Sequence, residues 1–317
     1  FHVSRTLARA EYNARMKNIV KTMHKYGIRA IISQDEDWGS DYLPYDKKPE
    51  HSAYDKDGNI YKQSYPGWER NKAADIPCPT WLIEENDGAG LTKRIVKIIK
   101  GLMKKDGEID VKKQIVEVMK EYNADGYCRS VEMGASDRYC FCNRCINEFK
   151  KMYPDASPAE IAPGSGKWLD FRCRQNAEIS GIMNGAVHAV GKDKVFYCYS
   201  SFQGETGLQR YKTDWKYYQD RCDIAIAGII GSLEDTQKAL GKTRWIGRVG
   251  TYAYQPREAN NIIYAQFVKS NCFGIRIFEY FQTQGITYYL TSLLAQYGTK
   301  ANEYMPREYS IGKVVLH

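Results

Sequence analysis

The sequence predicts an α/β fold, a single (β/α)8 TIM barrel that spans residues 1–317. Three observations lead to this class. Short apolar segments typical of buried strands alternate with amphipathic helical segments, which indicates a parallel sheet with helical crossovers. The alternation runs through all 317 residues without an internal repeat, a low-complexity tract or a linker, and single barrels reach this length. No Gly-x-Gly-x-x-Gly follows a strand segment, which disfavours an open sheet that binds a dinucleotide.

The first helix and strand are predicted near the N-terminus. Met16, Val20 and Met23 recur on one helical face within residues 10–26, and Gly27 ends that helix. The apolar segment "IRAIIS" that follows predicts a buried strand. It delivers three acids to the next loop, namely Asp35, Glu36 and Asp37.

Residues 38–90 form a long polar and aromatic segment with turn signals at "DKDGN" and "YPGW". A loop of this length is usually functional or contains an unrecognised element, and we predict a short strand at "PTWLI", residues 79–83. Amphipathic helices are predicted next at 92–105 and 111–122. They lead into a strand at "ADGYCRSVE", residues 124–132.

The second half of the chain continues the alternation. Helices are predicted at 167–190, 233–240, 258–269 and 285–298. Strands are predicted at "KVFYCYS" (194–200), "DIAIAGII" (223–230), "RWIGRVGTY" (244–252) and "FGIRIFEYF" (273–281). The strand candidates then number seven, whereas a (β/α)8 barrel has eight strands. The eighth strand either precedes Phe1 or lies in the long loop. The N-terminal part of the barrel is therefore expected to be incomplete or irregular.

The composition narrows the class of protein. With 43% hydrophobic and 26% charged residues, the chain resembles a globular protein with an ample core, and no apolar stretch is long enough to span a bilayer. The net charge of +8 comes from lysines scattered over helices, and no nucleic-acid-binding motif accompanies it. The 25 tyrosines and 6 tryptophans suit amphipathic ligands such as sugars, which present both hydroxyls and apolar faces.

The nine cysteines are an odd number, which argues against a fully paired disulfide framework and favours reduced or metal-bound thiols. Reduced thiols point away from an oxidising compartment. The start at Phe1 rather than Met favours a secreted or periplasmic protein, so the localisation stays open.

Active sites of such barrels lie at the C-terminal ends of the strands. Two strand segments share a pattern there: "RSVE" at 129–132 and "RIFE" at 276–279 each place an Arg within the strand and a Glu at its end. In one interpretation these Arg and Glu residues neutralise each other in a structural network. In the other, Glu132 and Glu279 face each other across the barrel mouth as a catalytic pair.

Two carboxylates on either side of a bond are what glycoside hydrolysis requires. One protonates the leaving oxygen, while the other attacks the anomeric carbon or activates water. The acids Asp35, Glu36 and Asp37 are a second source of the partner carboxylate. Further strand-end residues are expected to bind the substrate, namely Asp35, Asp37, Trp38, Tyr199, Arg248 and Tyr252.

The Cys-x-Cys-x-x-Cys pattern of Cys140, Cys142 and Cys145 places three thiols within reach of one tetrahedral zinc. Cys78, in the loop "IPCPT", is the best fourth ligand. The alternative is that these cysteines pack as small apolar side chains. A site with all four positions filled by protein is structural, so zinc is not expected to take part in catalysis. We expect no organic cofactor.

The strand that ends in Glu132 and the following "CFCNRCINEF" together resemble the family 42 β-galactosidases and related hypothetical glycosyl hydrolases. "ADGYCRSVEMG" and "KWLDFRCRQNAEIS" are similar to their strand and to the helix after their cysteines. The resemblance implies that a zinc cluster begins about nine residues after an acid/base Glu at the end of the fourth strand, and Glu132 precedes Cys140 by eight residues. The family has Asn before this Glu, whereas Val131 stands here.

The family's nucleophile ends the seventh strand. Glu279 takes that place if "PTWLI" is not a strand. If "PTWLI" is a strand, "RWIGRVGTY" is the seventh and carries no carboxylate. The leading hypothesis is a glycoside hydrolase that acts on an oligo- or polysaccharide, with acidic sugars considered because arginines occur on strands. The alternative is a catalytically silent carbohydrate-binding barrel. Neither nucleic acid nor a membrane span is expected.

Overall fold

The computed structural model describes eight stretches of the chain, which are residues 2–3, 10–34, 49–63, 74–86, 111–132, 140–228, 230–250 and 274–278. The predicted helices at 92–105, 258–269 and 285–298 lie outside them.

Seven parallel strands form the main sheet of the described residues. In spatial order they are β1 (His2–Val3), β2 (Ile31–Gln34), β5 (Gly126–Ser130), β6 (Val195–Ser200), β7 (Ile224–Gly228), β8 (Arg244–Gly250) and β9 (Gly274–Phe278). The spatial order follows the chain order throughout. Each crossover therefore advances one strand in the same direction, as in a barrel, whereas a doubly wound sheet reverses direction at a switch point.

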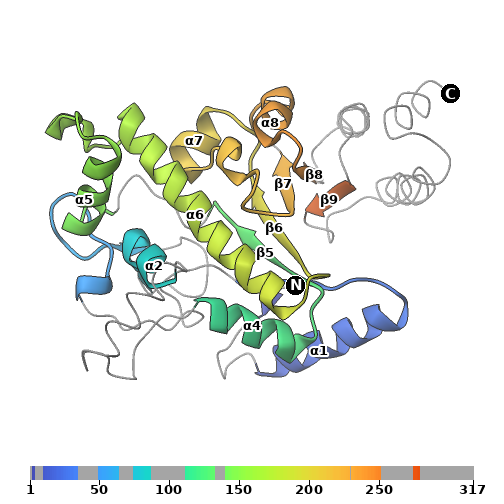
Figure 1. Ribbon diagram of the computed structural model, residues 1–317. Helices are drawn as coiled ribbons and strands as arrows, with labels where there is room; N and C mark the ends of the chain where they lie inside the picture. Colours follow the sequence, from blue (N-terminus) through green and yellow to red (C-terminus); the bar gives the residue numbers. More distant parts are fainter. Residues whose placement is uncertain are drawn as a thin grey trace.

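Helices cover the sheet and connect its strands. They are α1 (Ala10–Lys25), α2 (Pro79–Asn86), α4 (Val111–Tyr122), α5 (Asn143–Met152), α6 (Gly166–Val190), α7 (Glu205–Tyr211) and α8 (Leu233–Leu240). Short 3-10 turns occupy Pro49–His51, Pro158–Glu160 and Trp215–Tyr218. Figure 1 shows α6 crossing in front of β5 and β6, with α2 and α5 on one side of it and α4 at its lower end. None of the helices in the described stretches is long and apolar enough to cross a bilayer.

The sheet face toward α6 carries much of the core. Tyr127 and Arg129 of β5 are paired in register with Phe196 and Cys198 of β6, and all four are buried. Arg129 reaches α6 directly, because it donates hydrogen bonds to that helix. Since successive strand residues point to opposite faces, the positions of Ser130 and its partner Tyr199 belong to the other face.

At the N-terminal ends of the strands, the same arrangement of a carboxylate, a histidine and a backbone N–H occurs twice. Asp125 precedes β5, accepts a hydrogen bond from the Ala30 N–H (2.8 Å) and bonds His24 at the end of α1 (2.8 Å). Asp223 precedes β7, accepts from the Phe196 N–H (2.7 Å) and bonds His188 at the end of α6 (3.1 Å). Each carboxylate thus ties a helix end to the start of a neighbouring strand.

The strand predicted at "PTWLI" is wrong, because these residues begin helix α2. Pro79 is tolerated in a first helical turn, where its missing N–H would have no intrahelical partner. Trp81 and Leu82 are 3% and 2% exposed, so a short apolar run that suits a strand is here a buried helix. The long loop instead contains a small antiparallel pair, β3 (Lys62–Gln63) with β4 (Ala74–Asp75). The two-residue strand β1 was missed by sequence reasoning. Counted from β1, β9 is the seventh strand.

Candidate functional site

Glu132 lies at the C-terminal end of β5, where the predicted active site is expected. The Val131 N–H donates to the Tyr199 carbonyl (2.9 Å), which extends the β5–β6 ladder by one residue, and Glu132 comes directly after it. Glu132 is half-buried, whereas Val131 is fully buried. The end of the strand therefore holds the Glu132 backbone in place and leaves the residue partly exposed.

The Arg129 side chain of the "RSVE" pattern is hydrogen-bonded to helix α6. The Arg129 guanidinium donates to the Asn176 carbonyl (2.7 Å), to the Asn176 Oδ1 (2.9 Å) and to the Ser180 Oγ (2.5 Å), all on α6. The buried charge of Arg129 thus has polar partners on α6.

Asn176 joins the end of β5 to the end of α7. Its Nδ2 donates to the carbonyls of Val131 (3.1 Å), Tyr211 (3.2 Å) and Lys212 (3.2 Å). Tyr211, at the last position of α7, thereby comes near Glu132: burial raises the pKa of the Tyr211 phenol, and the Glu132 charge raises it further. Sequence reasoning missed both Asn176 and Tyr211, because neither follows a strand and no local pattern marks them.

Two other strand-end residues are built into the fold. Gln203 holds the loop after β6: its backbone N–H donates to Thr236 Oγ1 (2.7 Å), its Nε2 to Asp214 Oδ1 (3.1 Å), and its Oε1 accepts from the Trp215 N–H (2.9 Å). Tyr199, expected to bind substrate, is 7% exposed on the sheet face opposite α6.

Several predicted site residues lie outside the described part of the chain, namely Asp35, Glu36, Asp37, Trp38, Tyr252 and Glu279. Arg248 belongs to β8, where its backbone is paired in register with Gly228 of β7 and Arg276 of β9.

The order of the strands limits which carboxylates can pair with Glu132. Counted from β1, Glu132 follows the third strand and Glu279 the seventh, whereas the resemblance implied the fourth and the seventh. The strand three places on from β5 is β8, whose residues "RWIGRVG" include no carboxylate. Glu279 follows β9, four places on from β5. Strands four places apart lie on opposite sides of an eight-stranded barrel.

The four predicted metal ligands do come together. The sulfur atoms of Cys78, Cys140, Cys142 and Cys145 all lie within 4.8 Å of one another. Cys78 Sγ is 3.4 Å from Cys142 Sγ and 3.6 Å from Cys145 Sγ, and all four thiols are free rather than disulfide-bonded. Cys142 caps α5 by accepting from the Cys145 N–H (3.5 Å), so the first turn of that helix presents two thiols to one point.

These separations fit a tetrahedral metal. Four sulfurs at about 2.3 Å from a zinc ion lie about 3.8 Å from one another, close to the distances between the Cys78 sulfur and its neighbours. Burial opposes ionisation of the Cys145 thiol, yet hydrogen bonds from the other three thiols and the charge of buried Arg172 lower its pKa well below the ordinary value. A metal–thiolate centre carries negative charge, which Arg172 would offset. The donor set therefore fits a zinc ion.

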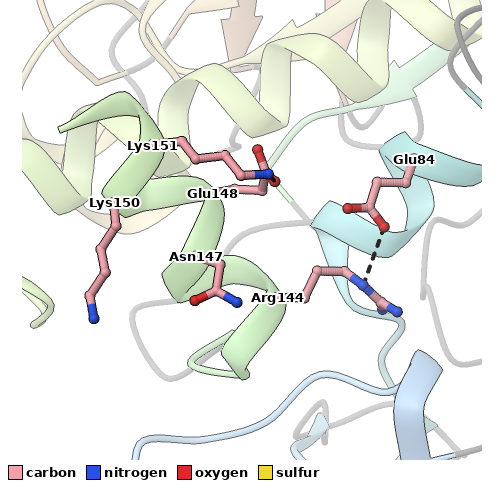
Figure 2. Close-up of a pocket in the computed structure, with 6 residues that line it drawn as sticks. All are labelled: Glu84, Arg144, Asn147, Glu148, Lys150 and Lys151. Carbon is pink, nitrogen blue, oxygen red and sulfur yellow. Dashed lines mark hydrogen bonds and ion pairs between the residues drawn. The ribbon is translucent and has the colours of Figure 1, made fainter. Parts of the chain in front are cut away.

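A recess of about 680 Å³ lies on α2 and α5, away from the strand ends. Charged side chains line it. Figure 2 shows the ion pair between Arg144 and Glu84 (3.2 Å) at one side, and Lys151 turned toward Glu148, with which it forms another ion pair. None of its lining residues follows a strand of the sheet, so this recess is not the predicted active site.

No family model matches the chain, and no curated protein matches it in sequence. Solved structures do match its fold. The β-galactosidase from the psychrophilic Marinomonas ef1 has a TM-score of 0.54 at 9% identity, over 93% of this chain and 54% of that one. The catalytic domain of the β-amylase from Paenibacillus polymyxa has a TM-score of 0.51 at 9% identity, over 88% of this chain and 84% of that one.

These likenesses show the fold of the chain, an α/β fold with a parallel sheet that it shares with this β-galactosidase and this β-amylase catalytic domain. The predicted fold class and the resemblance to β-galactosidases are thereby confirmed at the level of the fold. The chain spans about half the length (54%) of the Marinomonas β-galactosidase.

Proposed function

We propose that this chain is a glycoside hydrolase in which Glu132 is the general acid/base. The observation that carries the proposal is the place of Glu132 at the C-terminal end of a parallel strand. It is half-buried and follows Val131, whose N–H and carbonyl are both hydrogen-bonded, in the fold of a β-galactosidase and of a β-amylase catalytic domain. Carboxyl groups at strand ends are where barrel enzymes place their chemistry.

The second carboxylate has two sources in this proposal. Glu279 follows β9 and would face Glu132 across the mouth. The acids Asp35 and Asp37 follow β2, the strand next to β5, and neighbouring strands are only about 4.8 Å apart. Carboxyl groups about 5–5.5 Å apart give retention of configuration, and about 6.5–9.5 Å inversion. A pair drawn from β2 and β5 would therefore favour retention, and stereochemical analysis of the product tells the two apart.

The mechanism uses both carboxyl groups. Glu132 donates its proton to the glycosidic oxygen as the bond to the anomeric carbon breaks, and the partner carboxylate attacks that carbon or deprotonates water. The substrate is an oligo- or polysaccharide. Tyr199, Trp38 and Tyr252 would line the sugar site, and Arg248 would bind the carboxylate of an acidic sugar.

A second candidate is a catalytically silent carbohydrate-binding barrel. It is favoured by one observation, the lack of a carboxylate on β8, the strand three places on from β5. Such a protein would keep the aromatic and arginine side chains and bind sugar without turnover.

Glu132→Gln distinguishes the two candidates. An enzyme should lose turnover of glycosides with poor leaving groups by about 10²-fold or more, because the proton donor is gone, while a binder should keep its sugar affinity. Glu205→Gln, at an exposed acid in the first turn of α7, is the matched control and should leave turnover unchanged. Turnover that survives Glu132→Gln would refute the assignment of Glu132. Sugar binding without turnover in the unmodified protein would establish the silent barrel.

We further propose that Cys78, Cys140, Cys142 and Cys145 hold a structural zinc. The ion would clamp α5 to the loop before α2, directly downstream of Glu132, and take no part in the reaction because protein sulfurs fill all four positions. Metal analysis should find one zinc per chain, and Cys142→Ser should lower that content. Cys222→Ser, at a buried cysteine outside the cluster, should not. Full zinc content in Cys142→Ser would contradict the proposed ligand set.

A further inference from the structure

A buried polar pair, Arg129 and Asn176, lies next to Val131, the residue before Glu132. These two side chains are 0% and 4% exposed. The Arg129 Nη2 donates to the Asn176 Oδ1 at 2.9 Å. An amide oxygen only accepts and an amide nitrogen only donates, so this contact fixes which way the Asn176 amide faces. Its Nδ2 is directed to the opposite side, toward the strand-end loops.

On that side Nδ2 is shared among three carbonyls from two segments that are far apart in sequence. Val131 immediately precedes Glu132, while Tyr211 and Lys212 end α7. Lys212 has a left-handed backbone with φ of 52°, and its buried ammonium donates to the Gln209 carbonyl, which fixes this end of the helix further. One amide therefore sets the position of the Glu132 backbone relative to the Tyr211 backbone.

We propose that Asn176, oriented by Arg129, is a positioning residue that keeps the end of β5, and with it Glu132, near Tyr211, and that the Tyr211 phenol donates a hydrogen bond to Glu132 once its carboxyl ionises. The inference rests on the proposed hydrolase function. When Glu132 gives its proton to the leaving oxygen it becomes a carboxylate, and a phenol that keeps its own proton can then donate a hydrogen bond to it.

The electrostatics of the site agree with this geometry. Burial and the Glu132 charge both raise the pKa of Tyr211, so the phenol stays protonated over the pH range in which a carboxyl group titrates. Arg210 lowers the pKa of Tyr211 and partly offsets that effect. Tyr211 as a whole is half-buried.

The first test needs no activity. The tyrosinate absorbance of the whole protein minus that of Tyr211→Phe isolates the titration of Tyr211. The same difference in a Glu132→Gln background should show a lower Tyr211 pKa, because a negative charge has been removed. Asn176→Ala should reduce the effect of Glu132→Gln, because the two side chains would no longer be held together. A Tyr211 pKa that does not respond to Glu132→Gln would overturn the proposal, whether or not the protein is an enzyme.

The second test uses kinetics. Asn176→Ala should lower kcat about 10²-fold for glycosides with poor leaving groups, the loss expected for a misplaced catalytic group, and much less for activated aryl glycosides that need no proton. Ser180→Ala is the matched control. It also removes an acceptor of Arg129 on α6, but one that does not bind the carbonyls of Val131, Tyr211 and Lys212 as Asn176 does. Equal losses on both kinds of substrate would mean a merely structural role and overturn the proposal.

Tyr211→Phe supplies the variant that should fold without difficulty, because it keeps the carbonyl that Asn176 binds. Loss of the hydroxyl removes stabilisation of the Glu132 carboxylate and raises the pKa of the acid. The alkaline limb of kcat/KM should therefore move to higher pH, and an unmoved limb would contradict the role of Tyr211. If the unmodified protein hydrolyses no glycoside, the proposed function fails while the tyrosinate titration still decides whether Glu132 and Tyr211 are held together.

Discussion

Replacement of Phe149 by Ala should destabilise the protein strongly. Phe149 lies on α5 one turn after Cys145 and is 0% exposed. Its ring centroid is 5.0 Å from that of Trp168 and 5.7 Å from that of Phe171, both in edge-to-face orientation and both on α6. The aromatic cluster therefore attaches α5, and with it two of the thiols, to the helix that covers β5 and β6.

The magnitude follows from two terms. Exposure of a fully buried Phe side chain on unfolding contributes about 2 kcal/mol of transfer free energy. Truncation to Ala leaves a void of roughly 100 Å³, which at about 24 cal/mol per Å³ adds roughly 2 kcal/mol. The sum of about 4 kcal/mol lies within the usual range for buried Phe-to-Ala changes. At about 2 °C per kcal/mol for a large domain, Tm should fall by roughly 8 °C.

Thermal unfolding followed by circular dichroism measures the effect. Met152→Ala, on the same helix at a side chain that is 45% exposed, is the control and should change the free energy of unfolding by no more than about 0.5 kcal/mol. A loss below about 1 kcal/mol in Phe149→Ala would refute the reasoning, because it would mean that α5 is held by the thiol cluster alone.

Three further predictions concern the ends of the sheet and the metal. Burial opposes ionisation of Asp125, but hydrogen bonds from Ala30 and His24 and the charge of Lys194 outweigh it and lower the pKa of this carboxyl. Asp125→Asn should therefore lower Tm at neutral pH. The difference in Tm should shrink as the pH falls through the lowered pKa, below about 3.8. Gly231→Ala should cost at least about 1 kcal/mol in unfolding experiments, because φ is +119° and a Cβ would lie 2.6 Å from the Gln203 carbonyl oxygen. Gly185→Ala, in α6 with open space around it, should instead stabilise by about 0.5–1 kcal/mol. A chelator should lower Tm without competing with substrate in steady-state assays.

Each of these predictions has a contrary outcome. A Tm difference for Asp125→Asn that persists undiminished in acid would show that the carboxylate charge is not the cause, because both proteins would then be neutral at that position. Equal effects of the two glycine substitutions would remove the steric argument for the loop after β7. An unchanged Tm after verified removal of the metal would show that the thiol cluster is stable without it.

The repeating apolar pattern determined most of the fold in advance. The strands at β2, β5, β6, β7, β8 and β9 and the helices α1, α4, α6 and α8 were all predicted near their observed bounds. These elements are long or strongly periodic, and their pattern is local. "PTWLI" was predicted wrongly because five residues show no period, and only burial of Trp81 and Leu82 among neighbouring segments decides between helix and strand. The strand β1 has two residues, too few for any pattern.

The sequence by itself determined that the chain alternates strands and helices, that a Glu ends one strand, and that Cys140, Cys142 and Cys145 lie within reach of one ion, because these are relations between residues close in the chain. Only the tertiary structure decided that Cys78 completes the cluster, since it approaches from 62 residues away. It also decided that Arg129 donates a hydrogen bond to Asn176, and that Asn176 links the end of β5 to the end of α7, which brings Tyr211 near Glu132. Such contacts depend on the face to which each strand residue points and on how α6 and α7 lie against the sheet, which no local pattern encodes.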